Sequence, residues 1–189
     1  TMYNVAIGDE AGTAVTTGVQ NTLIGALSGD ALTTANNNVA LGYSALTANT
    51  TSNNNIAIGP FALNALNITT GGDGYNVAIG ANAGVAVTTG IQNTLIGGLA
   101  GDALTDADFN VAVGISTLSS DTKGNRSVAI GYAALETQNF TTSTDSYNTA
   151  VGALAGLSVT TGTLNTLIGG LAGDAITTGG SNVALGYFA

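Results

Sequence analysis

The chain has 189 residues, of which only 7% are charged; eleven are acidic and two are basic, which gives a formal net charge of −9. So few cations cannot neutralise a phosphate backbone, and this excludes nucleic-acid binding as an expected function. The absence of cysteine and histidine excludes disulfides, thiolate metal sites, and the commonest general base and metal ligand.

A short phrase, Asn-x-(Ala/Leu)-(Ile/Leu/Val)-Gly, recurs along the whole chain. Its glycines are separated by 17, 17, 17 and 21 residues, and this series then repeats, which defines blocks at approximately 1–72, 73–144 and 145–189. Repetition at a fixed period predicts one repetitive domain, 1–189, of about eleven coils. The glycines are Gly8, Gly25, Gly42, Gly59, Gly80, Gly97, Gly114, Gly131, Gly152, Gly169 and Gly186.

In chain order, the phrases predict short strands at 4–8, 21–25, 38–42, 55–59, 76–80, 93–97, 110–114, 127–131, 148–152, 165–169 and 182–186. Val, Ile and Thr favour strands, whereas the Thr-Thr-Gly, Asn-Asn-Asn and Gly-Gly sequences between them favour turns. A second strand in each coil is predicted at segments such as 43–46, 60–63 and 132–135. We therefore predict an all-β parallel β-solenoid (β-roll) with one coil per phrase and a spacing of about 4.8 Å. The four extra residues of each 21-residue coil should form a protruding loop.

Both faces of the first strand are apolar in every coil. Side chains alternate between the faces of a strand, so Val5 and Ile7 share one face and Ala6 lies on the other. This pattern is typical of strands that are buried on both sides. We predict that the Val5 and Ile7 positions fill the coil and that the middle residues face a partner in a homo-oligomer. The predicted interface residues are Ala6, Leu23, Ala40, Ala57, Ala78, Leu95, Ala112, Ala129, Ala150, Leu167 and Ala184.

An asparagine opens nearly every phrase, and only Ser127 interrupts the series. An asparagine at a tight corner can bond to neighbouring backbone and stack on its counterpart in the next coil. We therefore predict a structural ladder with no ligand role. Its members are Asn4, Asn21, Asn38, Asn55, Asn76, Asn93, Asn110, Asn148, Asn165 and Asn182.

The phrase Asn-Val-Ala-Ile-Gly, followed by a segment of small residues, resembles the head repeats of trimeric autotransporter adhesins and the solenoid segments of bacteriophage tail fibres. This resemblance covers essentially the whole chain and implies a left-handed β-roll, three of which associate around a common axis. The present coils are longer than those of adhesin heads, and neck, stalk and tip features of either family are not recognisable. The chain stops part-way through a coil, as a segment of a longer fibre would.

Few residues could carry chemistry. Asp102, Asp106 and Asp108 could together hold a hard cation, but the other two blocks do not repeat the last two of these acids. Asp30 and Asp174 repeat Asp102 at intervals of four coils, too far apart to share an ion. The adjacent acids Asp9 and Glu10 have no predicted cleft. We predict no catalytic residue, no metal site and no cofactor.

The expected function is that of a structural or adhesive segment of a trimeric extracellular fibre, on a virion or on a cell surface, without membrane insertion. A host-surface receptor or a glycan is the expected external partner, contacted by the inserted loops near 69–75 and 140–147. The alternative is a monomeric solenoid that binds ice, because stacked threonines are typical of that class. Threonine pairs recur in the turns, at 16–17, 33–34, 50–51, 69–70, 88–89, 141–142, 160–161 and 177–178.

Overall fold

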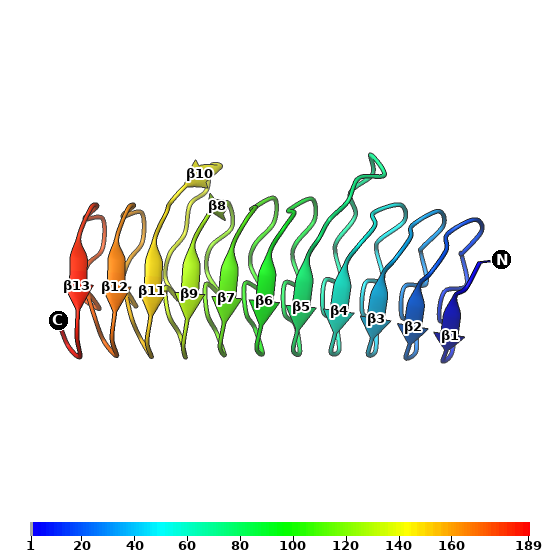
Figure 1. Cartoon of the computed structure of the whole chain (residues 1–189), viewed down its shortest axis with the longest axis horizontal. Coiled ribbons are helices and arrows are strands. Elements are labelled where there is room, and N and C mark those ends of the chain that lie inside the picture. Colours follow the sequence, from blue (N-terminus) through cyan, green and yellow to red (C-terminus); the bar gives the residue numbers. More distant parts are fainter. Residues whose placement is uncertain (1) are drawn as a thin grey trace.

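The computed structural model describes residues 2–189 and shows a rod of stacked coils with the two ends of the chain at opposite ends of the rod (Figure 1). Eleven short parallel strands form one continuous sheet along the rod, one strand per coil. This arrangement confirms the predicted all-β parallel solenoid. The strands are β1 (Val5–Ile7), β2 (Thr22–Ile24), β3 (Val39–Leu41), β4 (Ile56–Ile58), β5 (Val77–Ile79), β6 (Thr94–Ile96), β7 (Val111–Val113), β9 (Val128–Ile130), β11 (Thr149–Val151), β12 (Thr166–Ile168) and β13 (Val183–Leu185).

The register between coils follows the repeat throughout. Ala6 pairs with Leu23, and Ala57 pairs with Ala78 across the longer connection of 21 residues. The extra residues therefore stay outside the sheet and protrude on one side of the rod (Figure 1). In the second inserted loop, β10 (Thr144–Asp145) pairs in parallel with β8 (Gly124–Asn125) of the preceding coil.

The predicted second strand of each coil is wrong. The segments 43–46, 60–63 and 132–135 form turns, in which every second residue is left-handed; φ is 52° at Ser44 and 57° at Leu46. A strand cannot contain such residues, because left-handed backbone reverses the chain direction. The physical reason is that each coil of 17 residues contains only one three-residue strand in the sheet, so the rest of the coil must turn to bring the chain back to the start of the next strand. Stacking still continues through these turns, because the Leu46 N–H donates to the Ala62 carbonyl in the next coil at 3.0 Å.

The predicted orientation of the strand faces is also wrong. The middle residues of the strands lie inside the coil, and Leu23, Ala40 and Leu95 are fully buried within a single chain. The predicted interface side chains therefore form the core and cannot meet a partner. The buried residues are Leu23, Ala40, Ala57, Ala78, Leu95, Ala112, Ala129, Ala150 and Leu167. Ala6 and Ala184 occupy the same strand position in the two end coils and pair in register with Leu23 and Leu167.

The narrow interior explains this orientation. Wherever the middle strand residue is Leu, the residue that faces it from the turn is glycine: a Cβ on Gly29 would lie 2.8 Å from Leu23 Cδ2. Where the middle residue is Ala40 or Ala57, the turn instead supplies Leu46 or Leu63, both fully buried. Between the strand and the facing turn residue there is room for only one leucine, which comes from the strand in some coils and from the turn in others. The 72-residue super-repeat therefore reflects the order in which the strand or the turn supplies the buried leucine.

Candidate functional site

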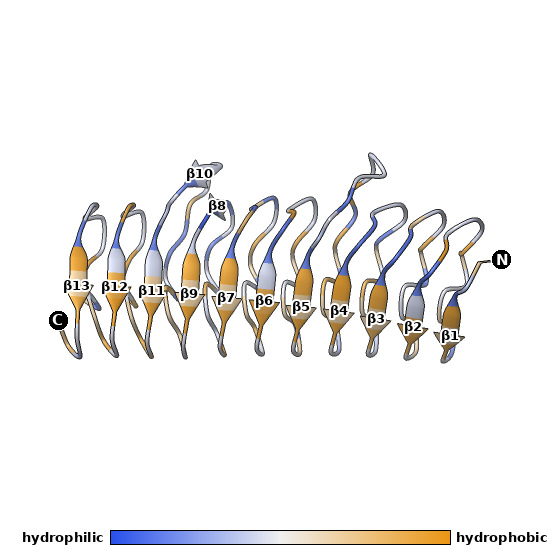
Figure 2. Ribbon diagram, in the orientation of Figure 1, coloured by the Kyte–Doolittle hydropathy of each residue, from blue (hydrophilic) through white to orange (hydrophobic). Residues whose placement is uncertain are grey.

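The outward side of the sheet is apolar along the whole rod. We call the first and third residues of the eleven strands the outer strand face. All are Val, Ile, Leu or Thr, and none is charged. Within the rod most of them are partly exposed, and Leu41 (42%) and Ile130 (38%) are among the more exposed ones. The strands appear as a row of mostly hydrophobic segments in Figure 2, each preceded by a hydrophilic residue, which is a ladder asparagine everywhere except before β9, where it is Ser127.

The size of the outer strand face sets it apart from an ordinary exposed surface. Eleven strands at about 4.8 Å make it roughly 50 Å long, and three residues make it about 10 Å wide. The resulting ~500 Å² is as large as the largest apolar patch of a typical monomer, and such patches commonly mark interaction sites. Sequence reasoning found that both strand faces are apolar but assigned the wrong one to the surface.

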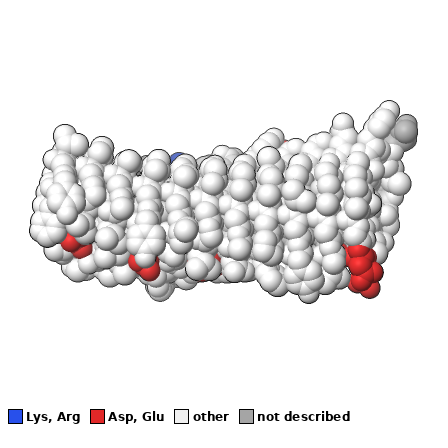
Figure 3. All heavy atoms as spheres, turned by 90° about the horizontal axis from the view of Figure 1, so that it is seen from below, with Lys and Arg blue, Asp and Glu red and all other residues white. Residues whose placement is uncertain are grey.

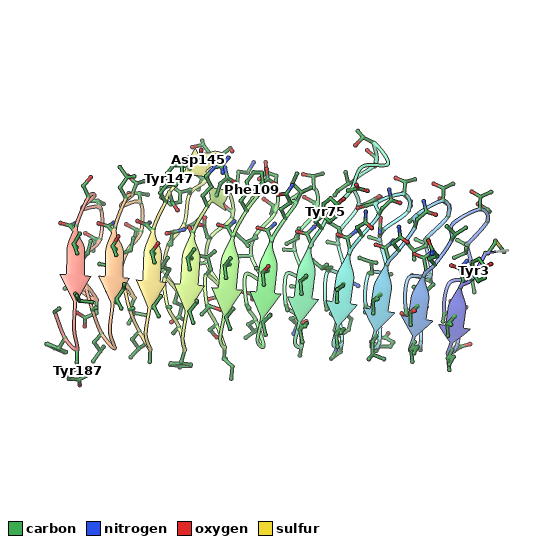
Figure 4. All side chains as sticks on the ribbon, in the orientation of Figure 1. Tyr3, Tyr75, Phe109, Asp145, Tyr147 and Tyr187 are labelled. Atoms are coloured by element: carbon green, nitrogen blue, oxygen red, sulfur yellow. The ribbon has the colours of Figure 1, made fainter. Side chains whose placement is uncertain are left out.

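Two further columns of side chains border the outer strand face. The leading column consists of the residues just before the ladder positions: Tyr3, Gln20, Asn37, Asn54, Tyr75, Gln92, Phe109, Arg126, Tyr147, Leu164 and Ser181. The trailing column consists of the residues just after the repeat glycines: Asp9, Ala26, Tyr43, Pro60, Ala81, Gly98, Ile115, Tyr132, Ala153, Gly170 and Tyr187. Tyr75, Phe109 and Tyr147 lie along one edge of the rod and Tyr187 lies at the other (Figure 4).

The asparagine ladder forms as predicted. Asn93 Oδ1 accepts the N–H of Asn110 at 3.0 Å, and Asn93 Nδ2 donates to the carbonyl of Ala107 at 2.8 Å. The same pattern recurs along the rod, for example from Asn21 to Asn4 Oδ1 at 2.8 Å. The ladder asparagines within the rod are buried and use their amides on the chain itself, which is a structural role.

A buried polar cluster replaces the ladder where Ser127 interrupts it. Gln138 Nε2 donates to Ser127 Oγ at 2.8 Å and to Asp121 Oδ2 at 2.6 Å, while Gln138 Oε1 accepts from Asn148 Nδ2 at 2.8 Å. Burial raises the pKa of Asp121, and the hydrogen bonds from Gln138 and from the Phe140 N–H oppose this rise. The cluster anchors the base of the second inserted loop. Only the interruption at Ser127 signalled it in the sequence.

The acidic residues do not gather into a cation site. Among residues 2–189, no group of three or more Asp or Glu side chains could hold a metal ion. Asp106 instead pairs with Lys123 at 3.4 Å, and Asp108 Oδ1 accepts the Ile91 N–H at 2.8 Å. Burial raises the pKa of Asp102, whose Oδ1 is buried without a hydrogen-bond partner.

Asp30 lies in the same position one block earlier, and its Oδ1 is likewise buried without a partner. No pocket is present in the described part of the chain, so Asp9 and Glu10 border no cleft. Seen from below, the edge of the rod is largely uncharged and carries a few separate acidic groups (Figure 3).

The threonine pairs lie at corners. In four of the eight pairs the first threonine donates its hydroxyl to the backbone of the next coil, as from Thr16 to the Thr33 carbonyl at 3.1 Å and from Thr88 to the Thr105 carbonyl at 3.2 Å. Hydroxyls that bond along the ladder of coils stabilise the corner and are not arranged as a free row. The second threonine of these pairs, such as Thr17 or Thr89, is exposed.

The inserted loops carry exposed aromatic residues beside acids. Tyr75 donates to Asp73 Oδ2 at 3.0 Å, and this hydrogen bond raises the pKa of the Tyr75 hydroxyl. In the second loop, Asp145 pairs with Arg126 at 3.2 Å, and the Arg126 guanidinium lies 4.5 Å from the centre of the Phe109 ring. These contacts order the loops against the leading column.

Comparison with protein-family models, with curated proteins and with solved structures finds no match to this chain. No helix among residues 2–189 has the length and apolar character needed to cross a membrane.

Proposed function

We propose that this chain is a structural segment of an extended extracellular fibre and that copies of the chain associate through the outer strand face. The observation that carries this proposal is the outer strand face, where 18 of the 22 residues are Val, Ile or Leu and the other four are Thr, in a chain with a net charge of −9. None of the eleven acids lies on that face, so self-association there brings no like charges into direct contact.

A second copy is the occupant that fits the face best. Its strands repeat at the same spacing over the same length, so the two surfaces can match coil by coil. With both bordering columns, the surface spans seven residues, which is at most roughly 23 Å, across a length of about 48 Å. The footprint of at most roughly 1,000 Å² per copy is comparable with the ~800 Å² per partner of a standard stable interface.

The number of copies in this proposal comes from the resemblance to trimeric adhesin heads and tail fibres. Three rods around a common axis would cover the outer strand faces and leave the threonine corners and inserted loops outside. The outer parts of the inserted loops, which are exposed at 69–71 and 141–143 and lie outside both columns, would then be available to a host receptor or glycan, which makes attachment the adhesive part of the proposal.

The alternative, ice binding by a monomer, would use the same flat face. Thr22, Thr94, Thr149 and Thr166 lie on it, but the other outward residue of each of their strands is Ile or Val. Of the sixteen hydroxyls in the threonine pairs, which first suggested this function, six donate hydrogen bonds within the chain. These observations favour association over ice binding.

Light scattering on the purified chain tests the proposal. The wild-type chain should have three times the 18.4 kDa mass of one chain. Ile96→Lys, at the centre of the outer strand face, should reduce the mass to that of a monomer while the circular dichroism spectrum is unchanged, because the side chain faces outward. Thr89→Lys places the same charge at an exposed corner and should leave the mass unchanged. A monomeric wild-type chain that inhibits ice recrystallisation would refute the fibre and support the alternative.

A further inference from the structure

The leading and trailing columns continue the outer strand face to its two edges. Both columns are exposed in nearly every coil and include bulky apolar side chains, such as Tyr75, Leu164 and Ile115. Within one chain the two columns cannot meet, because the five residues between them include the three-residue strand, which alone spans about 10 Å. Any packing between them therefore involves a second copy.

Two glycines of the trailing column have no explanation within the chain. A Cβ on Gly98 would have no atom closer than the Ala81 carbonyl oxygen at 4.0 Å, and its backbone is not left-handed. A Cβ on Gly170 would make only ordinary contact, at 3.5 Å from the Tyr187 ring. Gly98 and Gly170 are partly exposed. Glycine costs conformational entropy on folding, so a glycine on the surface without a backbone need indicates close approach from outside.

The sizes of the two columns are complementary in most coils. Gln92 shares its coil with Gly98, and Leu164 shares its coil with Gly170. Tyr75 and Tyr147 each share theirs with an alanine of the trailing column. In two coils the trailing residue is large and the leading residue is small.

The coils of Tyr43 and Tyr187 illustrate this reversal, since their leading residues are Asn37 and Ser181. The coils of Phe109 and Arg126 depart from the pattern, because both of their columns are bulky. There Arg126 already stacks on the Phe109 ring.

We propose that copies of this chain pack as parallel rods in which the leading column of one copy contacts the trailing column of the next, with each coil at the same level as its counterpart. A rotation axis along the rod brings opposite edges of neighbouring copies together at equal height, and the contact repeats until the ring closes. Antiparallel rods would lose this match of large with small residues. The inference rests on the proposed self-association and adds that the rods are parallel and that equivalent coils lie at the same height.

Disulfide formation tests this register, and the chain contains no cysteine that would interfere. In the double variant Gln92→Cys/Gly98→Cys the two sites of one chain are far beyond the ~7 Å Cα separation that a disulfide allows. Oxidation should therefore link neighbouring chains into a closed oligomer on a non-reducing gel. Gln92→Cys/Ala81→Cys and Gln92→Cys/Ile115→Cys, each displaced by one coil, should link far less. Gln20→Cys/Ala26→Cys, which also joins the leading and trailing residues of one coil, repeats the test without changing a glycine.

The outcomes separate this inference from the proposed function. A displaced pair that links better than the level pairs would overturn the register. If light scattering shows an oligomer but neither level pair links, the contact between the columns is wrong and self-association stands. A monomeric chain would overturn both.

Substitution of Gly98 gives an independent readout. Gly98→Leu should lower the oligomer mass at unchanged circular dichroism, because the single chain has room for the side chain. Thr89→Leu should not lower it. An intact oligomer in Gly98→Leu would contradict close approach at this glycine.

Discussion

Removal of one ladder amide offers the sharpest test of what holds the coils together. In Asn93→Ala, the Asn110 N–H loses the oxygen that accepts it at 3.0 Å, and the Ala107 carbonyl loses its donor at 2.8 Å. Both groups lie at the buried side of the corner, where water cannot replace the lost partner. A buried polar group left without a partner costs about 1–3 kcal/mol, so two such groups should lower the free energy of unfolding by about 2–5 kcal/mol. This is a large part of the roughly 5–15 kcal/mol that stabilises a typical domain.

Denaturant unfolding followed by far-ultraviolet circular dichroism measures this loss, and amide hydrogen exchange at Asn110 locates it. Asn37→Ala is the matched control, because the Asn37 side chain is exposed and makes no hydrogen bond to a described residue. The control has a cost of its own, since alanine at φ 58° is disfavoured by roughly 1–2 kcal/mol. If Asn93→Ala destabilises the chain no more than Asn37→Ala does, the ladder does not contribute as argued here.

Two further changes test the backbone and the buried cluster. Gly97→Ala should destabilise the chain by about 2–5 kcal/mol in thermal unfolding, because φ is 133° and the new Cβ would overlap the Gly114 carbonyl; stability equal to that of Gly98→Ala would contradict this. Burial raises the pKa of Asp121 above its unfolded value of about 3.9, so the folded state binds the proton more tightly, and stability should fall as pH rises from about 4 through the folded pKa. Asp102 and Asp108 shift in the same direction, so Asp121→Asn should reduce this fall without abolishing it; denaturation curves at pH 4 and pH 8 that change equally in both proteins would refute the role of Asp121.

Much of the architecture could be predicted because each sequence repeat forms one coil. The spacing of the glycines determined the number of coils, the register of the sheet and the position of the inserted loops. The asparagine ladder followed from one residue type at one position. These features depend on local chemistry that every coil repeats.

The second strand and the orientation of the first were predicted wrongly because the need to close the coil overrides the conformational preferences of individual residues. Ser44 and Leu46 carry no signal for left-handed backbone, yet the turn places both there because the chain must reverse within a few residues. The orientation of the strand was also missed, since alanine and valine are both apolar. A signal was present: Leu23 occurs together with Gly29, as Leu95 does with Gly101, which indicates that the middle strand residue faces the turn. The apolar surface of the candidate site followed only once this orientation was known.

The stacking of nearly identical coils also determines how the rod would respond to tension. Each coil is held mainly by its two neighbours, so a pull on the chain ends should detach one coil at a time. At about 3.4 Å per extended residue, a 17-residue coil releases roughly 58 Å of chain and a 21-residue coil roughly 71 Å. Under load the rod would lengthen in a series of three shorter steps and one longer one, and a tether of this kind dissipates force gradually instead of failing at once.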